Sequence, residues 1–248
     1  MTRVVATYNI KGGVGKTSAS VNLAWLAAAG GARVLLWDLD PQGAATFLLR
    51  IKPKVKGGGR RLVHRKSDPA ALVKGSDHER LDLLPADFSY RNMDLALDAT
   101  KRPTRGLARV IAPLAEDYDY VFLDCPPAIS LASESVFEAA DVLLVPLIPT
   151  PLSLRTFDQL RSFLSAEVAK PPQVLAFFSM TDGRKRLHAQ VVEELCSAHP
   201  GVVLPSEIPA LSDVERMATE RRAVVDFAPR GRGARAYGEL WSQLRQRL

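Results

Sequence analysis

Short apolar runs alternate with amphipathic stretches along most of the chain. Apolar, β-branched runs indicate buried strands at residues 3–8, 33–37, 81–84, 119–124, 141–146 and 173–178. Apolar residues at helical spacing predict helices at 16–29, 43–49, 88–97, 104–115, 131–139, 153–168, 185–198 and 234–247. This alternation predicts an α/β fold, a doubly wound, mainly parallel sheet flanked by helices. No linker, repeat or low-complexity tract interrupts it, so residues 1–248 are expected to form a single domain.

The first predicted strand and helix are joined by a glycine-rich loop. Its sequence is Lys11-Gly12-Gly13-Val14-Gly15-Lys16-Thr17-Ser18. Glycines let successive N–H groups turn toward an anion, and the following helix adds its positive N-terminal end. The strict phosphate-loop pattern needs a glycine where this chain has Ile10. The loop therefore predicts a phosphate site of an unusual kind, with a second lysine, Lys11, ahead of the expected Lys16.

Aspartates follow two later strands. Asp38 and Asp40 end the second strand two residues apart, so an extended chain points them to the same side. Asp124 ends the apolar run Tyr120-Val-Phe-Leu. Ligands of open parallel sheets bind beyond the carboxyl ends of the strands, where all three aspartates fall. With the Thr17 hydroxyl, they suit Mg²⁺ binding and positioning of a water molecule in nucleotide hydrolysis.

Three runs together resemble the ParA/MinD superfamily of deviant-Walker P-loop ATPases, and the pattern is closest to the ParA-like partition and positioning ATPases. They are Lys11–Thr17, Asp38-Leu-Asp-Pro-Gln-Gly43 and Leu123-Asp-Cys-Pro-Pro127. The resemblance extends to Met180–Arg184, to Ile208-Pro209 and to 226–237, so it covers nearly the whole chain.

The resemblance implies ATP and Mg²⁺ as cofactors and a role for each matching residue. Lys11 would reach the phosphates of a partner subunit, Lys16 would hold those of its own, and Asp40 would position the attacking water. The implied nucleotide-binding residues are Lys11, Gly12, Gly13, Val14, Gly15, Lys16, Thr17, Ser18, Met180 and Pro209, and the implied metal-site residues are Thr17, Asp38 and Asp124.

The chain is basic, with a net charge of +6 and a pI of about 9.5, which favours a polyanionic partner. Residues 52–66 combine lysines, arginines and three glycines and predict an exposed, mobile loop. A second group is expected to contact DNA without reading its sequence: Arg184, Lys185, Arg186, Arg216, Arg221 and Arg222. Solvated helix faces are the alternative explanation of these arginines. The family's basic position for DNA contact falls on Asp213, so its DNA-binding residues do not transfer directly.

Location and membrane contact follow from what the chain lacks. No run of 18 apolar residues is long enough to span a bilayer, and no signal peptide precedes the first strand. Two cysteines, Cys125 and Cys196, fit a reducing compartment. The expected location is the cytoplasm, in association with the nucleoid, and a membrane partner is not expected.

The resemblance implies an ATP-dependent homodimeric switch that hydrolyses ATP slowly to segregate or position a plasmid, a chromosome region or another cargo, and the basic charge adds non-specific DNA binding. A separate adaptor protein would stimulate hydrolysis. One alternative is a MinD-like membrane-associated ATPase, in which Leu240, Trp241, Leu244 and Leu248 would form an amphipathic stripe. Another is a metabolic P-loop enzyme. The cargo and the stimulating partner have no motif in the sequence.

Overall fold

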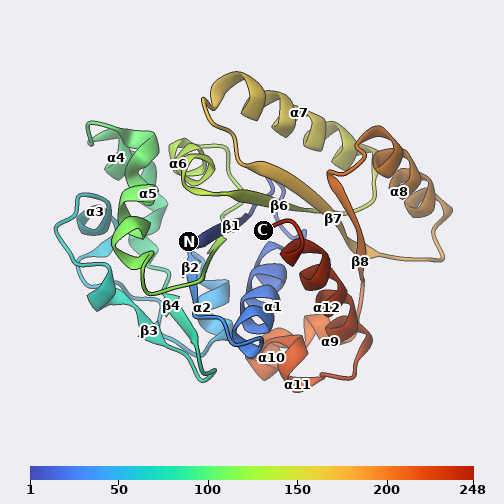
Figure 1. The fold of residues 1–248 in the computed structure, drawn as a ribbon, viewed down its shortest axis with the longest axis horizontal. Coiled ribbons are helices and arrows are strands. Elements are labelled where there is room, and N and C mark those ends of the chain that lie inside the picture. Colours follow the sequence, from blue (N-terminus) through green and yellow to red (C-terminus); the bar gives the residue numbers. More distant parts are fainter.

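Eight strands form one sheet in the computed structural model, which describes residues 1–248 (Figure 1). The strands are β1 Arg3–Thr7, β2 Val34–Asp38, β3 Lys74–Gly75, β4 Leu81–Leu84, β5 Tyr120–Asp124, β6 Val142–Leu147, β7 Gln173–Thr181 and β8 Val203–Pro209. Their order is β3-β4-β2-β5-β1-β6-β7-β8, and only the β3–β4 pair is antiparallel. The expected mainly parallel α/β sheet is confirmed, and β1 lies near its centre.

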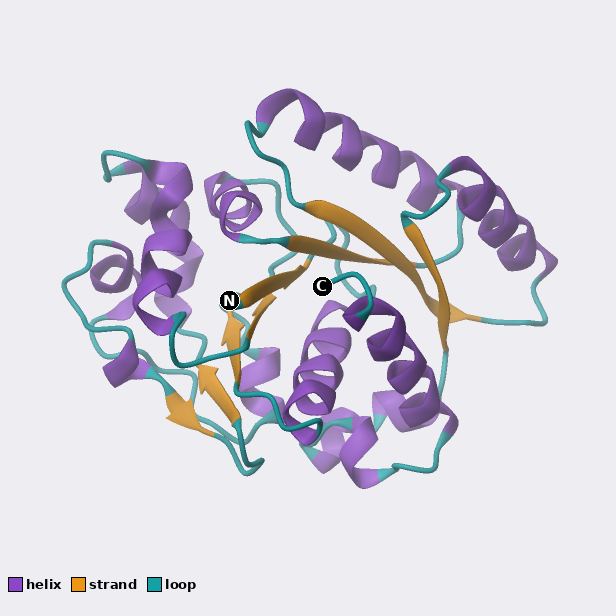
Figure 2. Ribbon diagram, viewed as in Figure 1, coloured by secondary structure: helices purple, strands orange, loops and turns teal.

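Helices cover both faces of the sheet (Figure 2). They are α1 Lys16–Ala29, α2 Ala44–Leu48, α3 Gly58–Val63, α4 Met93–Asp98, α5 Gly106–Ile111, α6 Leu131–Ala139, α7 Pro151–Glu167, α8 Arg186–Ala198, α9 Ser212–Glu215, α10 Met217–Glu220, α11 Val224–Phe227 and α12 Arg232–Arg245. Buried residues of α3 to α8 belong to one apolar cluster, and those of α1, α2 and α10 to α12 belong to another. The architecture is therefore a three-layer helix–sheet–helix arrangement.

The two apolar clusters lie on opposite faces of the sheet and contain 34 and 30 buried residues. Successive residues of a strand alternate between them, as Val4 and Ala6 join the first cluster and Val5 joins the second. All five residues of β2 are buried. This is why the strands appear in the sequence as continuous apolar runs, since a sheet covered on both faces has no solvent side.

The structure differs from the predicted elements at an added strand, an earlier helix start and two broken helices. Strand β8 alternates buried residues with exposed Pro205 and Glu207, so it lacks a continuous apolar run. Helix α7 begins at Pro151, two residues before the predicted start. The helices predicted at 88–97 and 104–115 are both broken by 3₁₀ turns, at Phe88–Asn92, Pro103–Arg105 and Ala112–Leu114.

Residues 52–66 are expected from the sequence to form an exposed loop, but the structure places a helix within them. Helix α3 lies within this segment and buries Leu62 and Val63, while Val55 is buried just ahead of it. The glycines form a tight turn: Gly58 has φ +70°, and a Cβ there would stand 2.7 Å from Ser89 Oγ. The backbone N–H of Gly59 donates to that hydroxyl at 2.8 Å. The positive φ and the close neighbours account for glycine at these positions.

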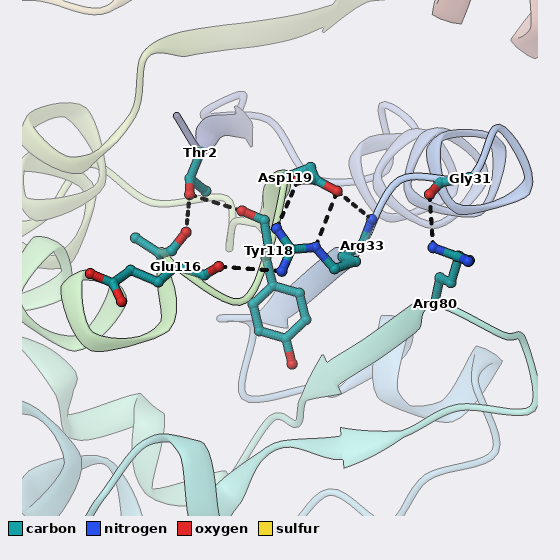
Figure 3. A network of polar contacts seen from close by, with 8 residues as sticks. Thr2, Gly31, Arg33, Arg80, Glu116, Tyr118 and Asp119 are labelled. Carbon is teal, nitrogen blue, oxygen red and sulfur yellow. Dashed lines mark hydrogen bonds and ion pairs between the residues drawn. The ribbon is translucent and has the colours of Figure 1, made fainter.

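Polar contacts join the chain where β2 and β5 begin (Figure 3). The Arg33 guanidinium contacts Asp119 at 3.0 Å, and the Arg33 backbone N–H donates to the same carboxylate at 2.8 Å. The Thr2 hydroxyl donates to the carbonyl oxygen of Tyr118 at 2.8 Å. Because the ion pair is exposed it contributes little stability, roughly 0–1 kcal/mol. The network fixes the amino ends of the strands, opposite the edge where the predicted site residues lie.

The apolar stripe of the C-terminal helix α12 packs inside the protein. Leu240 and Leu244 are fully buried, and the Trp241 ring meets the Tyr120 ring edge-on at 5.4 Å. The stripe thus covers the chain's own sheet rather than forming an exposed amphipathic face. None of the helices is both long and apolar enough to cross a bilayer.

Candidate nucleotide site

The glycine-rich loop leaves the end of central strand β1 and leads into α1 (Figure 1). Gly15 stands immediately before α1 with φ +89°, a conformation that L side chains rarely adopt. A Cβ on Gly15 would also stand 2.8 Å from Ser179 Oγ at the end of β7. Conformation and space both favour glycine here: the φ is positive, and the loop backbone passes close to the end of β7, two strands away from β1 in the sheet.

Lys16 points back into the loop that precedes it. Its Nζ donates to the carbonyl oxygen of Lys11 at 2.9 Å, and the residue is only 7% exposed. Burial lowers the pKa of the Lys16 ammonium, and the charges of Asp124, Cys125 and Asp40 act against that shift. A buried ammonium held by a single carbonyl has hydrogen-bonding capacity left, and lysine has three donors. Phosphate oxygens fit that capacity.

The backbone of Lys11 is fixed, but its ammonium is not. The Lys11 backbone N–H donates to Asn9 Oδ1 at 2.9 Å, and Asn9 Nδ2 donates to the carbonyl oxygen of Pro146 at 2.8 Å. No hydrogen bond or ion pair within the chain uses the Lys11 ammonium. The loop therefore holds the start of this side chain in place and leaves its charge available to another molecule.

The other loop residues line the same turn. Val14 is buried, and Gly12 faces Pro127, whose Cγ would stand 3.9 Å from an added Cβ. The Ser18 carbonyl oxygen accepts a hydrogen bond from Asn22 Nδ2 at 2.7 Å. The loop therefore lies beside the segment that follows β5.

Asp124 is fully buried at the end of β5, between the ends of two neighbouring strands. It stands in register with Asp38 of β2 on one side and with Thr7 of β1 on the other. Ser20 Oγ donates to Asp124 Oδ1 at 3.2 Å, but Asp124 Oδ2 and Thr7 Oγ1 have no partner. Burial first, and then the charge of Asp38, raise the pKa of Asp124 to about 8, while the nearby Thr17 hydroxyl lowers it.

The unpartnered oxygen of Asp124 fits a hydrated divalent cation. Burying a carboxylate oxygen without a partner is costly, and a cation or its bound water would remove that cost. The chain has no cluster of three or more His, Cys, Asp or Glu residues that could hold a metal alone. Mg²⁺ is usually held by one or two protein oxygens together with water and substrate phosphates, so Asp124 and Thr17 suffice beside a bound nucleotide.

Asp38 differs from Asp124 because the chain already occupies both of its oxygens. Oδ2 accepts from the Thr46 backbone N–H at 2.8 Å and from the Thr46 hydroxyl at 2.7 Å, and Oδ1 accepts from the Asp40 backbone N–H at 3.2 Å. Burial raises the pKa of Asp38 to about 6, against the lowering effect of these bonds. Asp38 is thereby the anchor of α2 and of the turn that carries Asp40.

Asp40 lies in a tight turn after β2. Its Oδ1 accepts from the Gln42 backbone N–H at 2.9 Å, and its carbonyl oxygen accepts from the Gly43 backbone N–H at 2.8 Å. Its charge acts on both Lys16 and Asp124, raising the pKa of each. The three aspartates and Lys16, distant in the sequence, thus share one electrostatic site.

Met180 and Pro209 stand at the ends of β7 and β8, on the flank where Ser179 contacts Gly15. Met180 has φ +55° and is 40% exposed, and its neighbour Thr181 pairs with Pro209 across a register shift. A left-handed conformation at a residue other than glycine is strained. These two residues therefore form an irregular strand edge beside the phosphate loop.

The six cations predicted to contact DNA are largely engaged with the chain itself. Three arginines are in ion pairs: Arg184 with Asp182 at 2.9 Å, Arg216 with Glu220 at 2.6 Å and Arg222 with Asp226 at 2.7 Å. Arg216 also lies 3.7 Å from Asp213, and the Arg221 guanidinium stacks on Phe47 at 4.4 Å. Only Lys185 and Arg186 are exposed without an ion-pair partner.

Several residues of the site carried no sequence signal. Thr46, Ser20, Ser179 and Thr7 are small polar residues whose importance comes from the distant groups they meet. Asn9 could have been found, since a polar residue directly after a buried strand must place its amide somewhere.

A phosphate loop at the end of a central parallel strand, with aspartates at the ends of adjacent strands, defines a P-loop nucleotide hydrolase. A family model described as AAA domain matches residues 2–170. The chain belongs to this family, and it is a P-loop ATPase of the ParA/MinD superfamily.

Two curated relatives match over nearly their whole length. The chain is 31% identical to the sporulation initiation inhibitor protein Soj of Bacillus subtilis, over 97% of each chain. It is 30% identical to the chromosome partitioning protein ParA of Caulobacter vibrioides, covering 96% of this chain and 92% of the relative. A solved structure of cobyrinic acid a,c-diamide synthase from Mycobacterium smegmatis, with an ATP analogue and magnesium bound, aligns with a TM-score of 0.85 at 28% identity, over 99% and 95% of the chains.

Proposed function

We propose that this protein is an ATP-dependent dimerising switch that segregates or positions a cellular cargo. The observation that carries the proposal is the unpaired ammonium of Lys11 on a fixed backbone, in the same loop as the buried Lys16. One lysine serves the bound phosphates from within the subunit, and the other is free to reach those of a partner. Supplying a cation from the partner ties hydrolysis to assembly.

ATP and Mg²⁺ are the cofactors of this switch. The loop N–H groups from Gly12 to Ser18 hold the phosphates, and Lys16 exchanges the Lys11 carbonyl for a phosphate oxygen. Thr17 and Asp124 hold Mg²⁺, which neutralises phosphate charge when bound. Asp40 orients the attacking water, and Met180 and Pro209 border the adenine.

Asp38 acts through the switch segment rather than on the metal. Its two oxygens hold Thr46 and the turn of Asp40, so a shift of Asp40 on nucleotide binding is transmitted to α2. In this arrangement Asp38 positions Asp40.

The basic chain binds duplex DNA through phosphates, without sequence preference, and works in the cytoplasm on the nucleoid. Its relatives named Soj and ParA, matched over nearly their full lengths, support a role in partitioning. A separate adaptor protein completes the site and stimulates slow hydrolysis. The cargo is a plasmid, a chromosome region or another assembly.

Substitution of Lys11 tests the proposal directly. In light scattering with ATP and Mg²⁺, wild type is expected to dimerise and Lys11→Ala to remain monomeric while still binding ATP. Lys16→Ala is expected to lose ATP binding itself, and Lys170→Ala, an exposed lysine away from the loop, is expected to behave as wild type. A Lys11→Ala protein that dimerises and hydrolyses ATP normally would refute the role of this lysine.

A membrane-associated switch of the MinD type would need an available amphipathic helix. The burial of Leu240 and Leu244 argues against one in α12. Sedimentation with anionic liposomes in the presence of ATP distinguishes the two, since the proposed switch stays in the supernatant.

A metabolic P-loop enzyme is a second candidate, because the solved structure at 28% identity is named as an amide-forming synthase. ATP hydrolysis that depends on cobyrinic acid and an amide-nitrogen donor would favour it. Hydrolysis stimulated by DNA and an adaptor protein would favour the switch.

A further inference from the structure

The basic residues of this protein fall into two groups that differ in their partners. Among the C-terminal cations, Arg184, Arg216 and Arg222 are neutralised by carboxylates of their own chain. None of the nine ion pairs of the chain involves a cation from residues 52–74. The segment between α2 and β4 therefore carries a dense group of cations without ion-pair partners, while Arg230, Arg232 and Arg235 are the unpaired cations just ahead of and within the start of α12.

The charge between α2 and β4 lines a hollow of about 1200 Å³. Five cations face it against a single carboxylate: Lys52, Lys54, Lys56, Arg61 and Lys74, with Asp68. All five cations are exposed. We call this surface the basic hollow.

Local geometry keeps the lysines of the hollow on the solvent side. Lys52, Lys54 and Lys56 alternate with Pro53 and with Val55, and Val55 is buried. The Val55 backbone N–H donates to Asp87 Oδ2 at 2.8 Å, which ties the segment to the body of the protein. The tight glycine turn and α3 follow immediately. The lysines are thus presented by an ordered backbone and not by a flexible tail.

Two further hollows adjoin the basic hollow and extend it into a band. One, of about 600 Å³, shares Ile51 and Lys52 with it, and the other, of about 420 Å³, shares Ser67 and Asp68. The first adds Arg50 and Arg221 to the lining, and the second adds Arg65, Lys66 and Arg109. An extended band of cations is suited to binding a polymer with repeated negative charge. A site for one small anion would instead need hydrogen-bond donors that enclose it.

We infer that the basic hollow, rather than the ion-paired Arg184, Arg216 and Arg222, is the surface that contacts the phosphates of duplex DNA. The inference rests on the proposed function and adds the site at which its DNA partner binds. Lysines are flexible point charges that suit phosphate contact, which carries no sequence information.

The basic hollow also begins beside the nucleotide switch. The Ile51 backbone N–H donates to the Thr46 carbonyl oxygen at 3.1 Å, and Thr46 in turn donates to Asp38. Lys52 is the next residue. A movement of Asp38 and Asp40 on nucleotide binding would therefore be passed through the short helix α2 to Lys52. This connection would make the affinity for DNA depend on the bound nucleotide.

A pair of charge-matched variants tests the inference in the full-length protein with ATP and Mg²⁺. The hollow variant carries Lys52→Gln, Lys54→Gln and Lys56→Gln. The control carries Arg184→Gln, Lys185→Gln and Arg186→Gln at the start of α8, which lies toward the opposite end of the sheet from α3 in Figure 1. Both lose three positive charges. Binding to a duplex of random sequence is measured over a range of salt concentrations, with ATP-dependent dimerisation as the check on folding.

The hollow variant is expected to bind at least about tenfold more weakly, with the slope of log affinity against log salt reduced by about three. The control is expected to keep the wild-type slope. Wild-type affinity in the hollow variant, or equal losses in both variants, would overturn this inference alone. No binding by wild type at low salt would overturn the DNA part of the proposed function as well.

Discussion

Thr46 donates two hydrogen bonds to one oxygen of Asp38, from its backbone N–H at 2.8 Å and from its hydroxyl at 2.7 Å. The same hydroxyl accepts the backbone N–H of Ala86 at 2.9 Å. All of these groups are buried, so one side chain joins the end of β2, helix α2 and the loop after β4. The segment bearing Asp40 is held to the sheet at this point.

Thr46→Val keeps the shape of the side chain and removes the hydroxyl. The Asp38 carboxylate and the Ala86 N–H each lose a buried partner, so we expect the free energy of unfolding to fall by about 1–3 kcal/mol. Urea denaturation measures it. Thr46→Ser retains the hydroxyl and is expected to lose less. Equal stability of the valine and serine variants would show that the hydroxyl bonds contribute nothing.

Asp124 is expected to make the stability of the metal-free protein depend on pH. Its pKa is raised to about 8 in the folded protein, from an ordinary value of 3.8, chiefly by burial. Between these values the folded state binds more protons than the unfolded state, so this residue lowers stability as pH rises toward 8. Asp124→Asn, which cannot ionise, should therefore gain melting temperature relative to wild type as pH rises. Parallel curves for the two proteins would contradict the shift.

Asp40→Ala separates nucleotide binding from hydrolysis. Without the carboxylate that orients the water, we expect ATP hydrolysis to fall by about 10²–10⁴-fold. Lys11 and Lys16 are untouched, so ATP-dependent dimerisation should persist and the dimer should be longer-lived. Phosphate release and light scattering measure the two properties. Asp117→Ala, an exposed aspartate without an ion pair, serves as the control, and loss of dimerisation in Asp40→Ala would show that Asp40 has a structural role instead.

The central strands and the phosphate loop could be predicted from the sequence because their physical requirements are local. A strand buried on both faces must be apolar throughout, as in β2. A loop that turns its N–H groups toward an anion needs glycines beside one another. Asp38 and Asp124 were found because each follows such a strand, and the sheet then places them in register.

The other features of the fold and site could not be predicted, because they depend on contacts with residues distant in the sequence. Strand β8 alternates with exposed residues at the end of the parallel sheet and has no continuous apolar run. The role of Thr46 depends on Asp38 and Ala86, which lie 8 and 40 residues away. The ion pairs of Arg184, Arg216 and Arg222 use nearby acids, but net charge alone could not show which arginines remained unpaired.

The glycine turn before α3 provides the last prediction, because glycines of flexible and of tightly packed segments look alike in a sequence. Gly58→Ala puts a Cβ at φ +70° and 2.7 Å from Ser89 Oγ. The left-handed conformation alone costs about 1–2 kcal/mol, so thermal unfolding should occur at a lower temperature. Gly183→Ala is the control, since Gly183 has no positive φ and open space around its Cβ position. It should leave stability unchanged or raise it slightly. If both variants melted together at the wild-type temperature, the turn would be adaptable, and the lysines ahead of it would lack the fixed backbone that the DNA surface requires.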